Sequence, residues 1–322
     1  MTAPTPERSL AGGKVKVYRV GLSAFCTAGV SVPASAQAMV CVIDRASVKN
    51  AVDRETASGL HEAFVSFAHD ASLCVAILAG AGGTFCAGAD LKSIASSSLA
   101  SATGSEGGNL LDPDMDAMAP MGVTRLAMNK PVIAAISGFA VAGGLELALW
   151  ADLRIATASA SLGVLCRLRG VPLIDGGTVR LPALIGGSRA ADLNLTGRLV
   201  GAKEAHHMGL VNYIVADNAE ASKGWEAVVE KALEVAAGLA SVPQTCMLND
   251  RSSMLNALYP ASHHEQAGVD LRLKGALRQA MQREFELGLH SLSQLMTEGQ
   301  VGAFVNRSAD EKQQDRSRRT KL

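Results

Sequence analysis

The sequence predicts an α/β protein whose second part is helical. Two short apolar runs, residues 75–79 and 132–136, are typical of buried strands, and the second is uninterrupted, as expected for a strand covered on both faces. Helical patterns lie between such strands, and after Gly197 they follow one another. This alternation predicts an α/β core followed by a helical C-terminal region.

The chain divides into three expected parts. Residues 1–196 form the core, residues 197–307 the helical region, and residues 308–322 a charged tail. Within the core, residues 93–118 are rich in Ser, Ala and Gly and then in acids. A segment with so little to bury predicts a mobile cover over a binding site.

The elements follow from the periodicity of apolar residues. Residues 1–14 are rich in Pro, Ser, Thr and Gly and are expected to be a loose tail, and residues 24–38 a loop. Strands are expected at residues 15–20, 39–43, 75–79, 132–136 and 154–156. Helices are expected at residues 54–68, 143–150, 202–208, 219–240 and 266–295.

Composition narrows the function classes. Lys plus Arg and Asp plus Glu number 30 each, so a neutral chain gives no general electrostatic reason to bind nucleic acid. The six cysteines form no CxxC pair and no zinc-like spacing with His, which favours reduced, mostly buried thiols and no metal site. No apolar run is long enough to span a membrane, so no membrane partner is expected.

Two segments stand out as carriers of chemistry. FCAGADL (85–91) and ISGFAVAGGLELALWADLRIA (136–156) each follow a predicted buried strand, and each places small residues where the chain leaves the sheet. Small residues let a ligand approach the backbone closely. Gly143 and Gly144 also open a predicted helix, whose free N–H groups and positive dipole end favour developing negative charge.

Together these segments resemble the paired oxyanion-hole motifs of the enoyl-CoA hydratase/isomerase (crotonase) family. KPVIAAISG (130–138), LGVLCRLRGVPLIDGGTVRLPALIG (162–186) and LTGRLVGAKEAHHMGLVNYIV (195–215) continue the resemblance, which covers roughly residues 39–250. The family implies a spiral of ββα units, a helical C-terminal trimerisation region, and homotrimers that often pair into hexamers. It implies an acyl-CoA thioester substrate and no cofactor beyond its coenzyme A moiety.

Site residues are implied by motif position. The backbone N–H groups of Ala89 and Gly143 correspond to the oxyanion hole, where two donors stabilise the charge that develops on a thioester oxygen by roughly 3 kcal/mol each. DRASVKNAV (44–52) resembles the loop on the coenzyme A side. The residues expected to contact coenzyme A are Asn50, Ala51, Ala87, Asp90 and Leu91.

Glu146 is the expected acid/base group. It follows Gly143 by three residues, which places the two on one face of a helix. Its helix is otherwise strongly apolar, so this carboxyl is expected to be functional or paired, with a perturbed pKa. In family hydratases this position holds one of two catalytic glutamates.

The second glutamate of the hydratases is missing. Its position, in a Pro-Glu pair, corresponds to Leu165-Cys166 here, and a thiol is a weak acceptor with a reference pKa of about 8.5. Asp175 is a candidate replacement, because dienoyl-CoA isomerases of the family carry a catalytic aspartate close to this position. A helix N-cap or turn role at Gly176-Gly177 is an equal alternative for Asp175.

The expected activity is water addition to a 2-enoyl-CoA in fatty-acid β-oxidation. Double-bond isomerisation is one alternative, because Glu146 alone can move a proton between carbons. A catalytically weakened acyl-CoA-binding scaffold is another. His206 and His207 are interpreted as surface or packing residues, and Cys86 as packing.

The two ends of the chain suggest its subcellular location. The final Thr320-Lys321-Leu322 resembles the Ser-Lys-Leu peroxisomal signal, which favours a peroxisome-like organelle. The basic N-terminal residues Arg8 and Lys14 make mitochondrial targeting an alternative. A cytoplasmic location is the further alternative.

Overall fold

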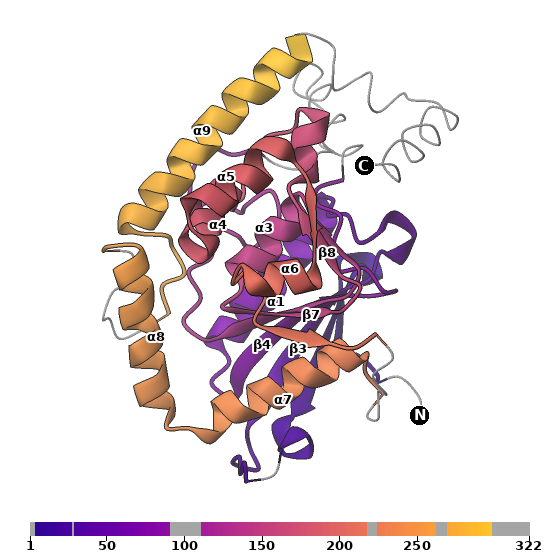
Figure 1. Ribbon diagram of the computed structural model, residues 1–322. Coiled ribbons are helices and arrows are strands. Elements are labelled where there is room, and N and C mark those ends of the chain that lie inside the picture. The colour runs from indigo at the N-terminus through magenta and orange to yellow at the C-terminus, as the bar shows by residue number, and fades with distance from the viewer. Residues whose placement is uncertain (1–3, 28, 91–110, 218–223, 262–268, 298–322) are drawn as a thin grey trace.

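The predicted α/β core and helical C-terminal region are confirmed by a computed structural model of the chain (Figure 1). It describes residues 4–27, 29–90, 111–217, 224–261 and 269–297. No helix in these ranges is both long and apolar enough to cross a bilayer.

A seven-stranded sheet forms the centre of the core. Its strand order is β1-β2-β3-β4-β5-β7-β10; β1, β2 and β3 are antiparallel neighbours, and all later pairs are parallel. The strands are Arg8–Leu10 (β1), Val15–Gly21 (β2), Gln37–Ile43 (β3), Leu73–Gly80 (β4), Val132–Ile136 (β5), Leu153–Thr157 (β7) and Tyr213–Val215 (β10).

A second, three-stranded sheet lies beside the first. It consists of Phe139–Val141 (β6), Ser161–Gly163 (β8) and Leu199–Gly201 (β9), with β8 in the centre. The helices of the core are Arg54–His69 (α1), Gly143–Trp150 (α3), Gly177–Ile185 (α4), Gly187–Thr196 (α5) and Ala202–His207 (α6). Those of the C-terminal region are Ala227–Ser241 (α7), Gln244–Leu258 (α8) and Gly275–Thr297 (α9).

Strand β4 shows why the sheet is covered on both faces. Val75, Ile77 and Ala79 pack in one apolar cluster with α7, while Ala76 and Leu78 pack in the other with α1 and α3. Successive side chains of a strand point to opposite faces, so an unbroken apolar run needs a layer on each side. Helix α7 lies along one face of the sheet in Figure 1, and α9 runs beside α4 and α5.

The N-terminal residues differ from the expected loose tail. Residues 8–10 form β1 on the edge of the sheet, and a short 3-10 helix, Ala11–Gly13, follows. Arg8 pairs with Glu62 of α1, and Lys14 Nζ lies 2.8 Å from a carboxylate oxygen of Asp53. These pairings attach a polar segment that no apolar pattern could have revealed.

The C-terminal helices also differ from the prediction. The helix expected at residues 266–295 begins only at Gly275, because the apolar residues Val269, Leu271 and Leu273 recur every second position, the spacing of extended chain. Helix α8 was not predicted, and none of its residues is buried, so it offers no apolar stripe to detect. Helix α7 begins at Ala227, later than expected; residues 218–223 lie outside the described residues.

The expected mobile segment is described only at its C-terminal end. Residues 93–110 lie outside the described ranges. In residues 111–118, Met115 is buried and packs with Leu273, Met281 and Phe285 of the C-terminal region. This end of the segment is therefore anchored by apolar contacts. The charged tail, 308–322, with its final tripeptide, lies outside the described residues.

Candidate active site

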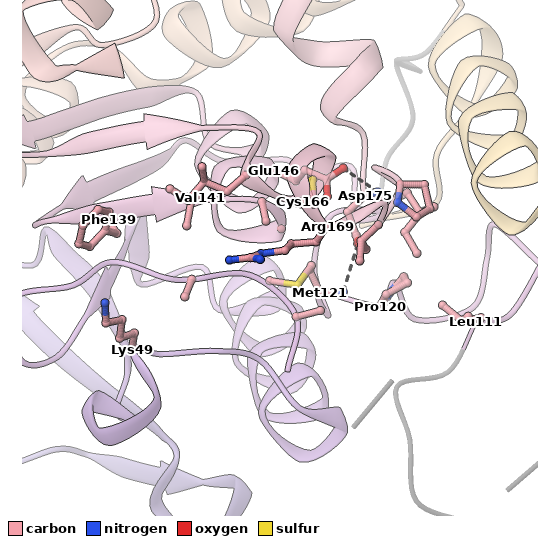
Figure 2. A pocket seen from close by; sticks show the side chains of 18 of the residues that line it. Lys49, Leu111, Pro120, Met121, Phe139, Val141, Glu146, Cys166, Arg169 and Asp175 are labelled. Carbon is pink, nitrogen blue, oxygen red and sulfur yellow. Dashed lines mark hydrogen bonds between the residues drawn. The ribbon is translucent and has the colours of Figure 1, made fainter. Parts of the chain in front are cut away.

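The cavity lined by the predicted catalytic residues Ala89, Gly143, Glu146, Cys166 and Asp175 has a volume of about 590 Å³. Lys49 and Phe139 line one end, and Leu111, Pro120 and Asp175 line the other. Figure 2 shows Glu146, Cys166 and Arg169 between the two ends, with the Arg169 guanidinium directed along the cavity. The walls are mostly apolar with a few polar groups, as is typical of ligand sites.

Ala89 and Gly143, the amide pair, come together on the wall of this cavity. Gly88 has φ +98°, and a Cβ built on it would lie 2.9 Å from the Gly143 nitrogen. The turn before Ala89 therefore packs directly on the start of α3, and only glycine allows that approach. Among the described residues, neither N–H of the amide pair has a hydrogen-bond partner.

Gly144 allows a second close approach between α3 and the segment that contains Cys86. A Cβ at this position would lie 2.1 Å from the carbonyl oxygen of Cys86. The strand-like segment around Cys86 donates its N–H to Phe139 and accepts from Val141, which fixes it along β6. The thiol of Cys86 is fully buried, and burial raises its pKa to about 12, which agrees with a packing role.

Glu146 is buried in α3, with 3% of its surface exposed, and lines the cavity. Its Oε1 accepts hydrogen bonds from the backbone N–H groups of Asp175 and Gly177, each at 2.9 Å. Burial raises the pKa of this carboxyl well above its ordinary range, and the nearby carboxylates of Asp175 and Glu284 raise it further. A buried carboxyl with a raised pKa that lines a cavity is a candidate for acid/base chemistry.

Asp175 is buried beside Glu146 and also lines the cavity. The N-cap alternative for this residue is wrong, because Gly176 occupies the N-cap position of α4. Its Oδ1 instead accepts from Thr124 Oγ1 at 2.5 Å and from the Met121 N–H at 3.1 Å. Burial raises its pKa to about 6 although these bonds and Arg125 act in the opposite direction.

Cys166 lies in the 3-10 helix Leu165–Arg169 and lines the cavity near Glu146. Burial, and secondly the neighbouring Glu146, raise the pKa of its thiol to about 12. Cys166 is therefore a neutral thiol at physiological pH and cannot act as a base there.

Glu284 of α9 is a buried polar residue that sequence analysis missed. It accepts hydrogen bonds from the N–H groups of Gly176 and Thr178, at 2.5 and 2.7 Å, beside Glu146 and Asp175. The only sequence signal was its position three residues after Met281, on the apolar face of the helix. Glu146, Asp175 and Glu284 are called the carboxylate cluster below.

Two buried arginines place positive charge beside the carboxylate cluster. Arg180 of α4 donates to the carbonyl oxygens of Asp175 and Thr124, at 3.1 and 2.7 Å. Arg125 lies over the ring of Phe285, 4.6 Å from its centroid, and its charge acts on Asp175. Three carboxyl groups face two guanidinium groups, which favours retention of one proton in the cluster.

The residues expected to contact coenzyme A fall into different places. Ala87 lines the cavity, and Leu91 lies outside the described residues. Asp90 lies 3.3 Å from Arg45, whose guanidinium also donates to the carbonyl oxygen of Ala51.

Asn50 has a structural place in this loop. It is fully buried: its amide donates to the carbonyl oxygens of Ala81 and Thr84, and its Oδ1 accepts from the Arg45 N–H. All its side-chain polar atoms are engaged inside the protein, so it shapes the loop. Lys49, which was not predicted, lines the cavity next to it.

Comparison with known proteins gives a consistent picture. The family model for Enoyl-CoA hydratase/isomerase matches residues 35–293. The chain is 37% identical over 195 residues to human mitochondrial Enoyl-CoA hydratase domain-containing protein 2, covering 60% of this chain and 64% of that protein. It is 39% identical over 176 residues to the Carnitinyl-CoA dehydratase of Proteus mirabilis, covering 54% and 63%. The chain thus spans slightly less than two thirds of these relatives.

Longer matches exist. The Mevalonyl-coenzyme A hydratase of Beauveria bassiana is 33% identical over 223 residues, covering 69% of this chain and 76% of that protein. Among solved structures, enoyl-CoA hydratase from Mycobacterium tuberculosis H37Rv matches with a TM-score of 0.60 at 32% identity, over 71% of this chain and 82% of that chain. Carnitinyl-CoA hydratase from Mycobacterium avium matches with a TM-score of 0.67 at 25% identity, over 91% and 95%.

Proposed function

The chain belongs to the enoyl-CoA hydratase/isomerase family, and from this premise we propose that it is an acyl-CoA enzyme that adds water to a 2-enoyl-CoA thioester, or removes it in reverse. One observation carries the proposal: Glu146 lines one cavity together with Ala89 and Gly143, whose N–H groups have no hydrogen-bond partner among the described residues. An acid/base group and two oxyanion donors are what this chemistry requires.

The amide pair is proposed to bind the thioester oxygen. When water adds to the β carbon, the π electrons of the double bond move toward the α carbon and the carbonyl, and the oxygen gains negative charge. Two fixed backbone donors stabilise that charge in a cavity with mostly apolar walls, where electrostatic interactions are stronger than in water. Gly143 begins α3, so the positive end of the helix acts in the same direction.

Glu146 is proposed to carry the proton transfers. Its carboxylate takes a proton from the water whose oxygen bonds to the β carbon. Glu146 then gives that proton to the α carbon, so that H₂O is added across the double bond and the carboxylate is regenerated. A raised pKa makes this carboxylate a stronger base than an ordinary glutamate, which suits the first half of the exchange.

Asp175 is proposed to take the place of the missing second glutamate. Cys166 remains a neutral thiol, whereas Asp175 lines the cavity beside Glu146 and titrates near pH 6. Two neighbouring carboxyl groups with different environments can divide the roles of acid and base.

The substrate is proposed to lie with its coenzyme A moiety toward Lys49 and its acyl group toward Leu111 and Pro120. Lys49 and Arg169 give the first end positive charge, which suits a ligand that carries phosphates, whereas the second end is apolar apart from Asp175. Crotonyl-CoA and longer 2-enoyl-CoA thioesters belong in the substrate panel, together with the carnitinyl and mevalonyl thioesters for which relatives are named.

The decisive experiment is turnover of this panel by purified protein, with Glu146→Gln as control. Formation of 3-hydroxyacyl-CoA that the variant loses supports the proposal. Tight thioester binding with no product from any panel member contradicts it and favours the scaffold alternative.

Double-bond isomerisation is a second candidate, favoured by the same single glutamate with an aspartate beside it. A 3-enoyl-CoA in the panel separates the two activities, because the isomerase product contains no added water. A mass increase of one water on a 2-enoyl substrate therefore identifies the hydratase.

We also propose an oligomeric state and a subcellular location for the chain. A homotrimer or hexamer is supported by α8, which has no buried residue and exposes Met254 and Leu258. A single-subunit mass by light scattering at micromolar concentration would contradict it. The mitochondrial alternative is supported by the mitochondrial names of the human and bovine relatives. Imaging a tagged full chain in cells tests it, and a peroxisomal location would contradict it.

A further inference from the structure

The loop that enters α4 is held by two carboxylates from distant helices. A single oxygen of Glu146 in α3, Oε1, accepts hydrogen bonds from the N–H groups of Asp175 and Gly177, each at 2.9 Å. These donors are two residues apart, and the N–H group between them points to a different acceptor.

That acceptor is Glu284 of α9. Its Oε2 accepts the Gly176 N–H at 2.5 Å, and its Oε1 accepts both the N–H and the hydroxyl of Thr178, each at 2.7 Å. Four consecutive N–H groups, from Asp175 to Thr178, thus alternate between the two glutamates. These bonds stabilise the ionised form of Glu284 and oppose its burial, which is the larger effect and raises the pKa of this carboxyl.

The start of α4 explains why two carboxylates are needed. Its N-cap residue is Gly176, which has no side chain to accept a hydrogen bond. The first N–H groups of a helix have no partner within the helix, and its positive end favours anions. Glu146 and Glu284 together supply the acceptors that a capping side chain supplies elsewhere.

The two glutamates differ in how many of their carboxylate oxygens accept a hydrogen bond from the described residues. Glu284 uses both oxygens in the loop and does not line the cavity. Glu146 lines the cavity, and no described residue donates to its Oε2. One carboxylate is therefore wholly committed to holding the loop, while the other keeps an oxygen for the ligand.

Titratable groups from four elements face Glu146. Asp175 lies in the entering loop, Glu284 on α9, Arg180 on α4 and Cys166 in the 3-10 helix that precedes the loop. Glu284 adds negative charge that favours a proton on Glu146. Loss of that charge should make Glu146 a stronger acid.

We propose that Glu284 is a positioning residue of the active site: from the C-terminal helix α9 it holds residues 176–178 so that Glu146 and Asp175 face the acyl-CoA cavity in a fixed arrangement. The proposal rests on the acyl-CoA function proposed above. It assigns the C-terminal region a part in catalysis in addition to assembly.

The kinetic test is Glu284→Gln in the full chain. Glutamine keeps the shape, but its NH₂ cannot accept a hydrogen bond, so at least one loop N–H loses its partner. We expect kcat to fall by roughly 10 to 100-fold with KM changed less than about 3-fold. The limb of the kcat/KM profile that reports Glu146 should move to lower pH.

Two variants control this result. Glu286→Gln removes the same charge two residues along α9 from an exposed side chain and should behave as wild type. Glu284→Asp keeps the charge with a shorter reach, so it should restore the position of the pH limb more than it restores kcat. If Glu284→Gln matches Glu286→Gln in kcat and in pH profile, the proposal is wrong.

Amide hydrogen exchange on substrate-free protein separates this proposal from the proposed function. Glu284→Gln should make the N–H groups of Gly176 and Thr178 exchange about tenfold faster. Unchanged exchange contradicts the holding role whatever the activity. Faster exchange in a protein whose wild type turns over no thioester contradicts the proposed function and with it the catalytic part of this proposal.

A second variant covers the case in which Glu284→Gln does not fold. Thr178→Val removes only the hydroxyl bond to Glu284 and leaves every charge in place. It should lower kcat by about 3-fold with KM unchanged and speed exchange at the same two N–H groups. Wild-type kcat and exchange in Thr178→Val would then overturn the proposal.

Discussion

The two halves of the candidate site are built in different ways. The amide pair consists of backbone groups, and its geometry depends on small residues that let two segments touch, as at Gly88 and Gly144. The carboxylate cluster consists of side chains from α3, α9 and the loop before α4, held by hydrogen bonds between elements far apart in the chain. A site made of backbone groups does not depend on particular side chains, but it needs room for the two segments to approach each other. The carboxylate cluster instead depends on particular side chains.

The largest expected effect is on the cluster. Glu146→Gln keeps an oxygen that can accept from Asp175 and Gly177, so the fold should survive. It removes the acid/base function, and kcat should fall by about 10³-fold with KM little changed. Steady-state kinetics on the best substrate of the panel measure both, and a kcat within 3-fold of wild type would show that another group moves the proton.

A single added methyl group should disturb the geometry of the amide pair. A Cβ at Gly88 would meet the Gly143 nitrogen at 2.9 Å, so Gly88→Ala should separate the two donors. We expect kcat/KM to fall by about 10²-fold, the effect of weakening one oxyanion donor. Gly83→Ala is the matched control: its φ is also positive, at +72°, but a Cβ there meets no atom within 4 Å.

That control separates backbone strain from displacement of the donors. Both variants place a side chain in the left-handed region and should carry a similar backbone strain, but only Gly88→Ala adds the contact with Gly143. If Gly83→Ala loses as much activity as Gly88→Ala, the contact with Gly143 is not the cause.

The carboxylate cluster should also make stability depend on pH. The pKa of Asp175 is about 6 in the folded chain, above its ordinary value of 3.8, so between these values the folded state binds more protons than the unfolded state. Stability should therefore fall as pH rises from about 4 to 6, by at most about 3 kcal/mol from this residue. Raised pKa values at Glu146 and Glu284 act in the same direction.

Asp175→Asn sharpens this prediction. Asparagine can still accept from Thr124 and Met121 but does not titrate. Urea unfolding at pH 4, 5, 6 and 7 should give a flatter stability profile for the variant than for wild type. Parallel profiles would show that Asp175 does not titrate in this range.

The contrast between the two halves also explains what the sequence could predict. Helix α3 and strand β5 have the predicted bounds, because apolar periodicity is a local signal. The segments of the amide pair were recognisable for the same reason, since small residues at fixed spacing lie within two short stretches. Asp175 was found as a candidate only through the resemblance, and its buried partners Thr124 and Met121 were not.

Glu284 shows the limit most clearly. Its partners Gly176 and Thr178 are more than a hundred residues away, and a glutamate on a long helix with many charges gives no local signal. The strand β1 and the late start of α9 were missed for similar reasons, because ion pairs and extended packing to other elements decide them. Contacts across the fold cannot be read from the spacing of one segment.

The smallest expected effect is at Cys166, which lines the cavity near Glu146. Its thiol is buried and neutral, because burial and Glu146 raise its pKa to about 12, so it supplies neither charge nor a proton at neutral pH. Cys166→Ser keeps the size and a weak donor, and kcat and KM should stay within about 3-fold of wild type. Iodoacetamide at pH 7.5 should leave activity intact, since a buried thiol with so little thiolate reacts slowly. A large loss of kcat in Cys166→Ser, or rapid inactivation that substrate prevents, would instead make Cys166 a direct participant and return the role proposed for Asp175 to this position.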